Sequence, residues 1–187
     1  MNERKQEHRL PSRQQALKLL SQAGCSREVI KHSKAVAELA TELAEEFRAK
    51  GCNVDLELVE LGALLHDIGR SRTHSVHHAM AGVEIAETLN LPKSVVSIIA
   101  CHVGGGITRE EAKRLGWKPR RYIPQTLEEK IVSYADLLIE RSRRVPIEKT
   151  IKRFSRELPP DAIGRMRKLH DEIQSLLGDG DANTHVA

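Results

Sequence analysis

The chain has 187 residues, of which only 3% are aromatic, so Leu, Ile, Val and Ala must fill the core, and this favours packed helices over a β-sandwich. The formal net charge of +4 weakly favours an anionic partner, because basic and acidic residues are interleaved over most of the chain. Three cysteines without a paired spacing, together with apolar runs too short for a signal peptide or a membrane span, indicate a cytoplasmic protein with no membrane partner.

The first part of the sequence predicts a flexible tail over residues 1–11 and then three helices, at 12–22, 26–51 and 55–68. In the second helix, His32 lies inside a stripe of apolar residues that recur at steps of three or four. A break at Gly69 stops the third helix. His66 and Asp67 are therefore expected at its C-terminal end.

The second part predicts six more helices, at 77–89, 92–102, 108–116, 126–139, 147–154 and 161–177. A glycine-rich segment at 103–106 is too brief to be a phosphate-binding P-loop. Residues 117–124 form a basic loop, and Asp136 is embedded in the apolar helix that follows. Since there is no repeat or linker, we expect an all-α protein with a single helical domain over 12–178 and a disordered tail over 179–187.

Four polar residues are candidates for a metal site. His32, His66 and Asp136 each interrupt the apolar face of a different helix, and Asp67 adjoins His66. A single buried histidine is usually a satisfied core residue, but buried polar groups need partners, and a shared cation would compensate all four together. Two imidazoles and two carboxylates suit Mn²⁺, Fe²⁺, Co²⁺, Ni²⁺ or Zn²⁺, with Mg²⁺ as a further option.

With His32 before it and Asp136 after it, the sequence His66-Asp67-Ile68-Gly69 resembles the H…HD…D signature of the HD phosphohydrolase superfamily, nearest to its HDIG group. The match extends over about residues 26–144. The resemblance implies an HD-domain helical bundle in which the four residues hold a divalent metal. It also implies that metal-activated water hydrolyses a phosphoester or phosphoanhydride bond in a nucleotide-like substrate, with His66 and Asp67 as catalytic residues.

Two further histidines, His78 and His102, resemble the extra histidine motifs of those superfamily members that bind two metal ions. The resemblance implies that they hold a second ion or a substrate phosphate, so that one or two ions are expected. Val103 stands where a second histidine often follows the position of His102, which weakens the argument for a second ion.

A closer likeness is to the bacterial symmetrical diadenosine tetraphosphate hydrolases. It rests on the loop His102-Val103-Gly104-Gly105 and on the helix Tyr134-Ala135-Asp136 that ends in Glu140-Arg141. The insertion at 108–124 has no counterpart in that family, so phosphomonoester, phosphodiester and dinucleoside polyphosphate substrates all stay open. The G-Y-P element of cyclic-di-GMP phosphodiesterases is missing, which argues against that substrate.

Arg70 and Arg141 follow the metal-site residues in sequence and are candidates to bind substrate phosphate, although a surface salt bridge is the alternative for both. His74 and His77 also border the motif and are considered for substrate contact.

Two rival functions are a regulatory HD module that binds a nucleotide through a degenerate site, and an RNA-binding helical protein. The second rests on the basic residues Lys118, Arg120, Arg121 and Arg141 to Arg144. Few aromatic residues are available to stack bases, which counts against it. We therefore expect a phosphorylated small molecule, a nucleotide, as the partner, with nucleic acid as the alternative. Native metal and oligomeric state are left open.

Overall fold

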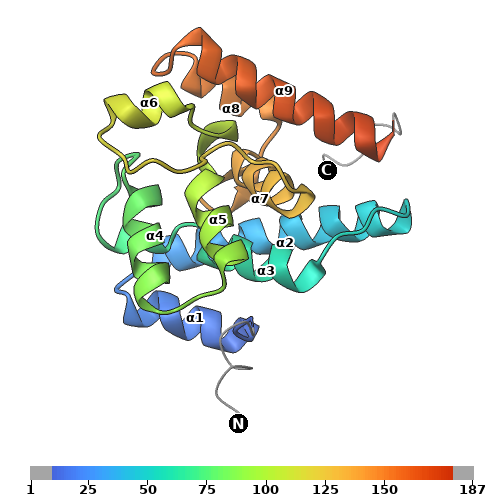
Figure 1. Cartoon of the computed structure of the whole chain (residues 1–187). Coiled ribbons are helices and arrows are strands. Elements are labelled where there is room, and N and C mark those ends of the chain that lie inside the picture. The colour runs from blue at the N-terminus through green and yellow to red at the C-terminus, as the bar shows by residue number, and fades with distance from the viewer. Residues whose placement is uncertain (1–9, 179–187) are drawn as a thin grey trace.

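The computed structural model describes residues 10–178, and the regular secondary structure of this part of the chain is almost entirely helical (Figure 1). Its α-helices are α1 (Arg13–Gln22), α2 (Arg27–Ala49), α3 (Leu56–Leu65), α4 (His78–Thr88), α5 (Lys93–Cys101), α6 (Arg109–Arg114), α7 (Leu127–Leu137), α8 (Ile147–Phe154) and α9 (Pro160–Leu177). Two short 3-10 helices, η2 (Ile68–Ser71) and η3 (Val103–Gly105), connect them. The tails predicted at 1–11 and 179–187 lie outside the described residues, apart from Leu10 and Pro11 before α1.

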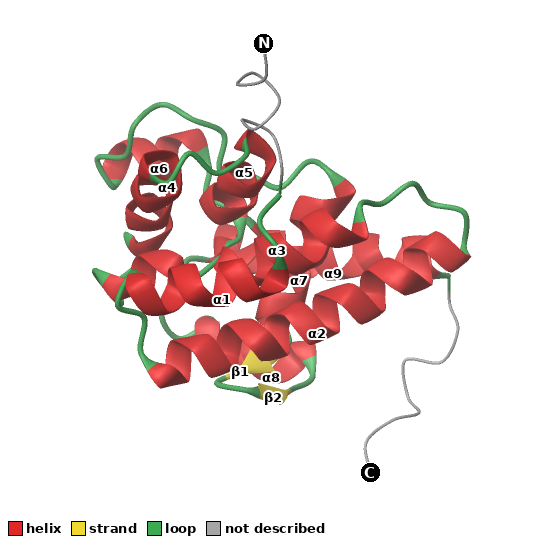
Figure 2. Cartoon of the chain, turned by 90° about the horizontal axis from the view of Figure 1, so that it is seen from below, coloured by secondary structure: helices red, strands yellow, loops and turns green. Residues whose placement is uncertain are grey.

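The all-α prediction is confirmed. Strand occurs among the described residues only in a short antiparallel hairpin, β1 (Ile139–Glu140) and β2 (Arg143–Arg144), which Figure 2 shows as the small yellow element beside the helices. The hairpin was not predicted, because its arginine-rich residues carry no apolar alternation. Val145 extends the pairing by donating its N–H to the carbonyl of Leu138 at 2.8 Å.

The core lies between five helices. α2 packs along α3 and α7, α3 also contacts α5, and α9 covers α7 from the side opposite α2 (Figure 1). The buried side chains are mostly Leu, Ile, Val and Ala, as the composition predicts. Each large aliphatic side chain buried in this way contributes about 1.5–3 kcal/mol. This packing fixes the helix ends on which the functional residues lie.

The helix starts follow from local sequence. Ser12, Thr108 and Thr126 each accept a hydrogen bond from the backbone three residues on and form a capping box, and Ser26 and Asp55 cap α2 and α3.

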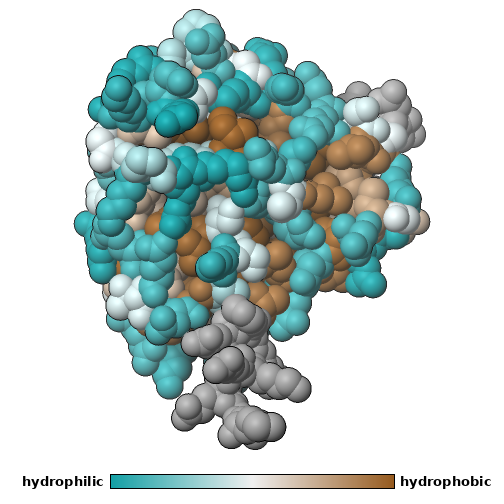
Figure 3. Space-filling view, in the orientation of Figure 1, coloured by the Kyte–Doolittle hydropathy of each residue, from teal (hydrophilic) through white to brown (hydrophobic). Residues whose placement is uncertain are grey.

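Hydrophilic side chains cover much of the face seen in Figure 3, with apolar patches between them. Over the described residues, no helix combines the length and the apolar character that crossing a bilayer requires.

The third helix ends earlier than predicted. α3 stops at Leu65 and η2 begins at Ile68, so the break falls at His66 and Asp67 rather than at Gly69. Gly69 has no positive φ, and its role is close packing. A Cβ there would lie 2.0 Å from the carbonyl oxygen of His78 and 2.4 Å from the backbone nitrogen of Gly82. Gly69 therefore lets η2 lie directly against α4, which brings Asp67 to His78.

The glycine-rich segment has a similar structural role. Gly104, Gly105 and Gly106 all have positive φ, which favours glycine. A Cβ on Gly105 would lie 3.3 Å from the backbone of Arg165 in α9. Arg165 also donates to the carbonyl of Gly106 at 3.0 Å and forms an ion pair with Glu111 of α6. The segment thus holds α9 close to the end of α5.

The predicted basic loop at 117–124 is more ordered than its sequence indicates. Tyr122 pairs with Ile107 in an isolated β-bridge. Arg120 pairs with Glu87, and Arg121 forms a two-fold hydrogen-bonded ion pair with the buried Glu129. Two of the cations behind the RNA-binding hypothesis are therefore already engaged with carboxylates.

Candidate metal centre

Six side chains from separate parts of the sequence meet at one point. They come from α2 (His32), the end of α3 (His66), the residue before η2 (Asp67), the start of α4 (His78), the end of α5 (His102) and the last turn of α7 (Asp136). Four are buried, whereas His32 and Asp136 are partly exposed. The structure thus brings together all six residues that the sequence analysis assigned to a first or second metal.

All four imidazoles are held in the same way. The Nδ1–H of His66, His78 and His102 is donated to the backbone carbonyl three residues earlier, at 2.6, 2.7 and 2.8 Å. His32 donates its Nδ1–H to the carbonyl of Arg141 at 2.8 Å. These bonds fix the tautomer of the neutral rings, so each Nε2 faces the cluster and offers a lone pair whenever it carries no proton. This is the arrangement in which histidine binds a metal.

Asp67 lies between two groups of histidines. Its Oδ2 is 3.7 Å from Nε2 of His32 and 3.6 Å from Nε2 of His66. Its Oδ1 is 3.2 Å from Nε2 of His78 and 3.6 Å from Nε2 of His102. The two oxygens of one carboxylate therefore belong to two sets of donor atoms, with Asp136 joining the first. Asp136 Oδ1 is 2.9 Å from His32 Nε2 and 3.5 Å from His66 Nε2.

The electrostatics of the cluster follow from burial and from its mixed charges. Burial opposes the ionised form of Asp67 and Asp136, but the neighbouring histidines hold the pKa of both carboxyls well below the usual range. Burial also disfavours imidazolium at His66, yet the two carboxylates raise its pKa to about 9. Burial lowers the pKa of His102. Both carboxylates are therefore ionised, and in the metal-free protein a proton on His66 offsets part of their charge, a role that a metal cation would take over.

Two atoms of the cluster lack the partners that buried polar groups require. Among the described residues, His66 Nε2 and Asp67 Oδ1 are buried without a hydrogen bond, although other donor atoms of the cluster lie within 4 Å of each. An unpaired buried polar atom costs about 1–3 kcal/mol, so such atoms call for an explanation. A divalent cation fits, because it would bond directly to nitrogen and carboxylate oxygen.

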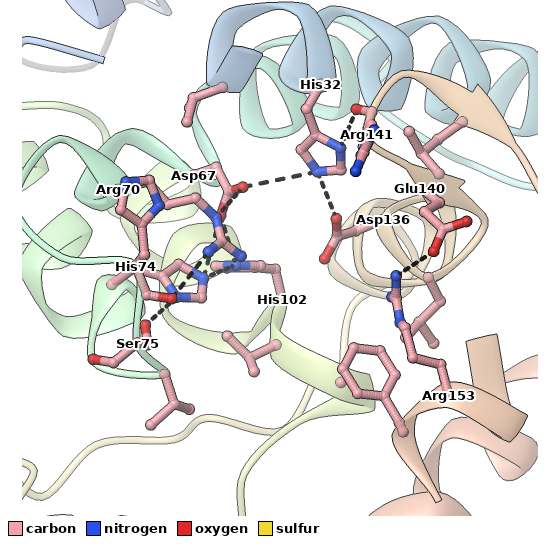
Figure 4. Close-up of a pocket in the computed structure, with 18 of the residues that line it drawn as sticks. His32, Asp67, Arg70, His74, Ser75, His102, Asp136, Glu140, Arg141 and Arg153 are labelled. Carbon is pink, nitrogen blue, oxygen red and sulfur yellow. Dashed lines mark hydrogen bonds and ion pairs between the residues drawn. The ribbon is translucent and has the colours of Figure 1, made fainter. Parts of the chain in front are cut away.

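Five of the six cluster residues, all except the fully buried His66, line a pocket of about 630 Å³. Figure 4 shows Asp67, Arg70, His74 and Ser75 on one side of it and Glu140 and Arg153 on the other, with His32 and Asp136 between them. This volume lies within the range of about 300–1,000 Å³ typical of small-molecule sites. The pocket is thus much larger than a metal ion alone needs.

The two predicted phosphate-binding arginines both line this pocket. Arg70 donates from Nε to Asp67 Oδ2 at 2.5 Å, so its cation lies beside the ligand cluster. Arg141 has a role that the sequence did not reveal, because its backbone carbonyl orients His32. His74 is exposed in the pocket lining, whereas His77 accepts a hydrogen bond from Trp117 and lies outside it.

Comparison with known proteins agrees with this architecture. A model of the HD domain family matches residues 29–140, and the chain belongs to this family. An uncharacterized protein from Methanocaldococcus jannaschii is 49% identical over 155 residues, covering 82% of this chain and 92% of that protein. A tRNA (cytidine(56)-2'-O)-methyltransferase from Picrophilus torridus is 36% identical over 178 residues, and this chain, matched over 95% of its length, spans 51% of that protein.

Among solved structures, the HD domain of the L. monocytogenes phosphodiesterase PgpH, in complex with cyclic-di-AMP, superimposes with a TM-score of 0.51 at 20% identity. The superposition covers 92% of this chain and 99% of that domain, and it supports the fold.

Proposed function

We propose that the chain is a divalent-metal-dependent phosphohydrolase that cleaves a phosphoester or phosphoanhydride bond in a nucleotide-like substrate. One observation carries the proposal: Asp67 presents each of its oxygens to a pair of imidazoles whose Nε2 atoms face it. When bound, a divalent cation supplies Lewis-acid activation of water and of a phosphoryl group. His32, His66, Asp67 and Asp136 would hold the first ion, and His78 with His102 a second ion or a phosphate.

The surroundings of the cluster suit a phosphorylated substrate. Arg70 and Arg141 line the same pocket, and each guanidinium offers several N–H donors in a fixed plane, which matches phosphate oxygens. The pocket lining at His78 and His102 is buried, which would limit the water that reaches the reacting phosphate. The roles proposed for the six cluster residues are those that the family resemblance implies, whereas Arg70 and Arg141 are proposed from their position in the pocket.

The comparisons do not identify the phosphate compound that the protein would cleave. The likeness to symmetrical diadenosine tetraphosphate hydrolases keeps dinucleoside polyphosphates among the candidates, although neither relative named above carries the name of such an enzyme. The name of the PgpH complex concerns cyclic-di-AMP and that protein. We therefore propose a nucleotide-like substrate without naming one compound.

RNA is a second candidate substrate, for one structural reason. Arg143 and Arg144 are exposed on the β1–β2 hairpin next to Arg141, which lines the pocket, so a basic strip adjoins the proposed site. The similarity to a tRNA methyltransferase agrees with this candidate, although the activity of that protein is its own and the chain spans only half of it. A regulatory module with a degenerate site is disfavoured, since all four signature residues converge.

We also propose that the protein is located in the cytoplasm. Cys25, Cys52 and Cys101 are all free thiols in the structure, which supports a reducing compartment such as the cytoplasm.

The proposal is tested by loading the purified protein with Mn²⁺ and assaying nucleoside mono-, di- and triphosphates, cyclic nucleotides, dinucleoside polyphosphates and a short RNA. Phosphate release or strand cleavage from at least one class is expected. Asp67→Ala and Asp136→Ala should abolish it while helical circular dichroism persists, whereas Asp171→Ala, an exposed acid on α9, should not. Turnover that survives in either cluster variant would place the chemistry elsewhere.

A further inference from the structure

The wall of the pocket opposite Arg70 carries a group of apolar side chains beside Glu140 and Arg153, and it comes from the C-terminal part of the chain. Leu137 and Ile139 contribute from the end of α7 and from β1, and Phe154, Leu158 and Met166 from α8, the following loop and α9. Most of this wall lies beyond residues 29–140, which the HD family model matches. A charged phosphate group is not stabilised by contact with an apolar surface, so we expect a different part of a ligand to contact this wall.

Phe154 differs from the other aromatic residues of the chain in its exposure to solvent. All five aromatic residues of the sequence lie within the described part, and Phe47, Trp117, Tyr122 and Tyr134 are buried in the fold. Phe154 is the only one of the five that stays partly exposed, and it lines the pocket that contains the candidate metal centre. Leu158 beside it is 37% exposed, one of three large hydrophobic residues exposed in the described chain.

The ring of Phe154 is also held in place. The guanidinium of Arg153 lies 4.6 Å from the ring centre, and its Nη1 donates to Oε1 of Glu140 at 2.8 Å. Lys149 pairs with the other carboxylate oxygen of Glu140 at 2.8 Å. Cation–π contacts of this kind contribute about 0.5–1 kcal/mol at exposed sites. A partly exposed aromatic ring fixed by charged neighbours is suited to binding a flat apolar group.

We propose that the base of a nucleotide packs against Phe154 and Leu158 while its phosphate lies at the metal centre. This inference rests on the proposed function and deepens it, because it makes α8, α9 and their loop the part of the chain that selects base-bearing phosphates. The two parts of the site are continuous, because one pocket of about 630 Å³ joins the ligand cluster and Arg70 to the apolar wall. A purine or pyrimidine base is planar, and stacking on an aromatic side chain contributes about 1–3 kcal/mol.

Binding to protein loaded with Zn²⁺, which is diamagnetic, tests the inference through affinity rather than turnover. The probes are the four nucleoside 5′-monophosphates, their 3′ isomers and ribose 5-phosphate, with dissociation constants from ligand-observed NMR. The best nucleotide should bind at least about fivefold more tightly than ribose 5-phosphate, the low end of one base stack. Phe154→Ala should remove this advantage and leave ribose 5-phosphate unchanged, whereas Phe154→Tyr should keep it.

A matched pair of leucines guards against a general loss of structure. Leu158→Ala should weaken nucleotide binding, while Leu89→Ala, at a similarly exposed position on the end of α4, should not. The inference is overturned if no nucleotide binds more tightly than ribose 5-phosphate, or if Phe154→Ala weakens both ligands equally. Hydrolysis of base-free phosphates without base preference would support the proposed phosphohydrolase function and contradict the base-binding role of Phe154 and Leu158. Base-dependent binding without any hydrolysis would support the base-binding role and contradict the phosphohydrolase function.

Discussion

The Nε2 atoms of His78 and His102 lie 2.9 Å apart, although the Nδ1–H of each ring is donated to a backbone carbonyl. Two neutral imidazoles held in this way direct lone pairs at each other, which is repulsive unless one of them carries a proton or both bind a cation. Asp67 Oδ1 adds a third donor atom within 3.6 Å of both nitrogens. The geometry therefore favours a cation on this side of Asp67.

We predict that protein loaded with Mn²⁺ and then desalted retains two ions per chain. His78→Ala and His102→Ala should each lower the content to about one, because the donors around His32 stay in place. Elemental analysis measures the content, and His74→Ala, an exposed histidine in the same pocket, is the control. Wild-type content in both variants, or a single ion in the wild type, would leave His78 and His102 as phosphate-binding residues instead.

Gly69→Ala should destabilise the fold more than any other small change near the site. The added Cβ would lie 2.0 Å from the carbonyl of His78, a backbone atom that cannot turn away, so η2 and α4 must separate. Overpacking of this kind costs about 1–3 kcal/mol and occasionally more. Gly164→Ala is the matched control, because a Cβ there meets nothing within 4 Å on helix α9 and should stabilise by about 0.5–1 kcal/mol. Urea unfolding of both variants decides whether Gly69 is required by packing.

The sequence predicted the helices well, and the six residues that it proposed for metal binding lie together in the structure, for a reason that is local. Serine, threonine and aspartate caps mark where helices begin. His66 and His102 follow the last residues of α3 and α5, where backbone carbonyls have no helical partner, so an imidazole can donate to the carbonyl three residues earlier. This orientation of the ring could have been predicted as well.

The features that the sequence did not predict depend on contacts between distant segments. The carbonyl that orients His32 belongs to Arg141, 109 positions further along the chain. Phe154 follows the spacing of an amphipathic helix, so nothing in its own segment distinguishes a pocket wall from a core position. The reason for Gly69 is likewise invisible until α4 is placed against η2. These positions follow from tertiary packing rather than from propensity.

Arg141 should act through both its backbone and its side chain, and substitution can separate the two. Its φ is 59°, a left-handed conformation that costs about 1–2 kcal/mol for residues with a Cβ. Arg141→Gly should therefore be more stable than Arg141→Ala by about 1 kcal/mol, with the carbonyl still bound to His32. If the guanidinium binds phosphate, both variants should raise KM about tenfold and Arg141→Lys less, since a charged hydrogen bond contributes about 1.5–3 kcal/mol. A KM equal to that of the wild type in all three variants would show that only the backbone of Arg141 contributes.

The metal-free protein should lose stability as the pH rises. The pKa of His66 is raised from 6.5 to about 9, so its protonation stabilises the folded state fully below pH 6.5, and this contribution is lost as the pH passes 9. Each unit of pKa corresponds to about 1.4 kcal/mol, which gives a loss on the order of 3 kcal/mol over this range. Urea unfolding of chelator-treated protein measures it, with His66→Gln as the reference. A wild-type free energy of unfolding that parallels the variant across this range would contradict the assignment.

The opposite pH dependence is expected from Glu129. This buried carboxylate binds Arg121 through both oxygens, accepts from Ser97, and caps the start of α7, and these contacts offset its burial and lower its pKa from 4.5 to about 2. A lowered folded pKa stabilises the protein above pH 4.5, and this contribution is lost as the pH falls towards 2.

Glu129→Gln should therefore cost about 2–3 kcal/mol at pH 7, because it leaves the Arg121 cation without its partner. The deficit should shrink when unfolding is measured near pH 3, while Glu110→Gln, an exposed acid on α6, should show no deficit at either pH. A deficit for Glu129→Gln that stays constant between pH 7 and pH 3 would mean that the hydrogen-bonding shape of the side chain matters and its charge does not.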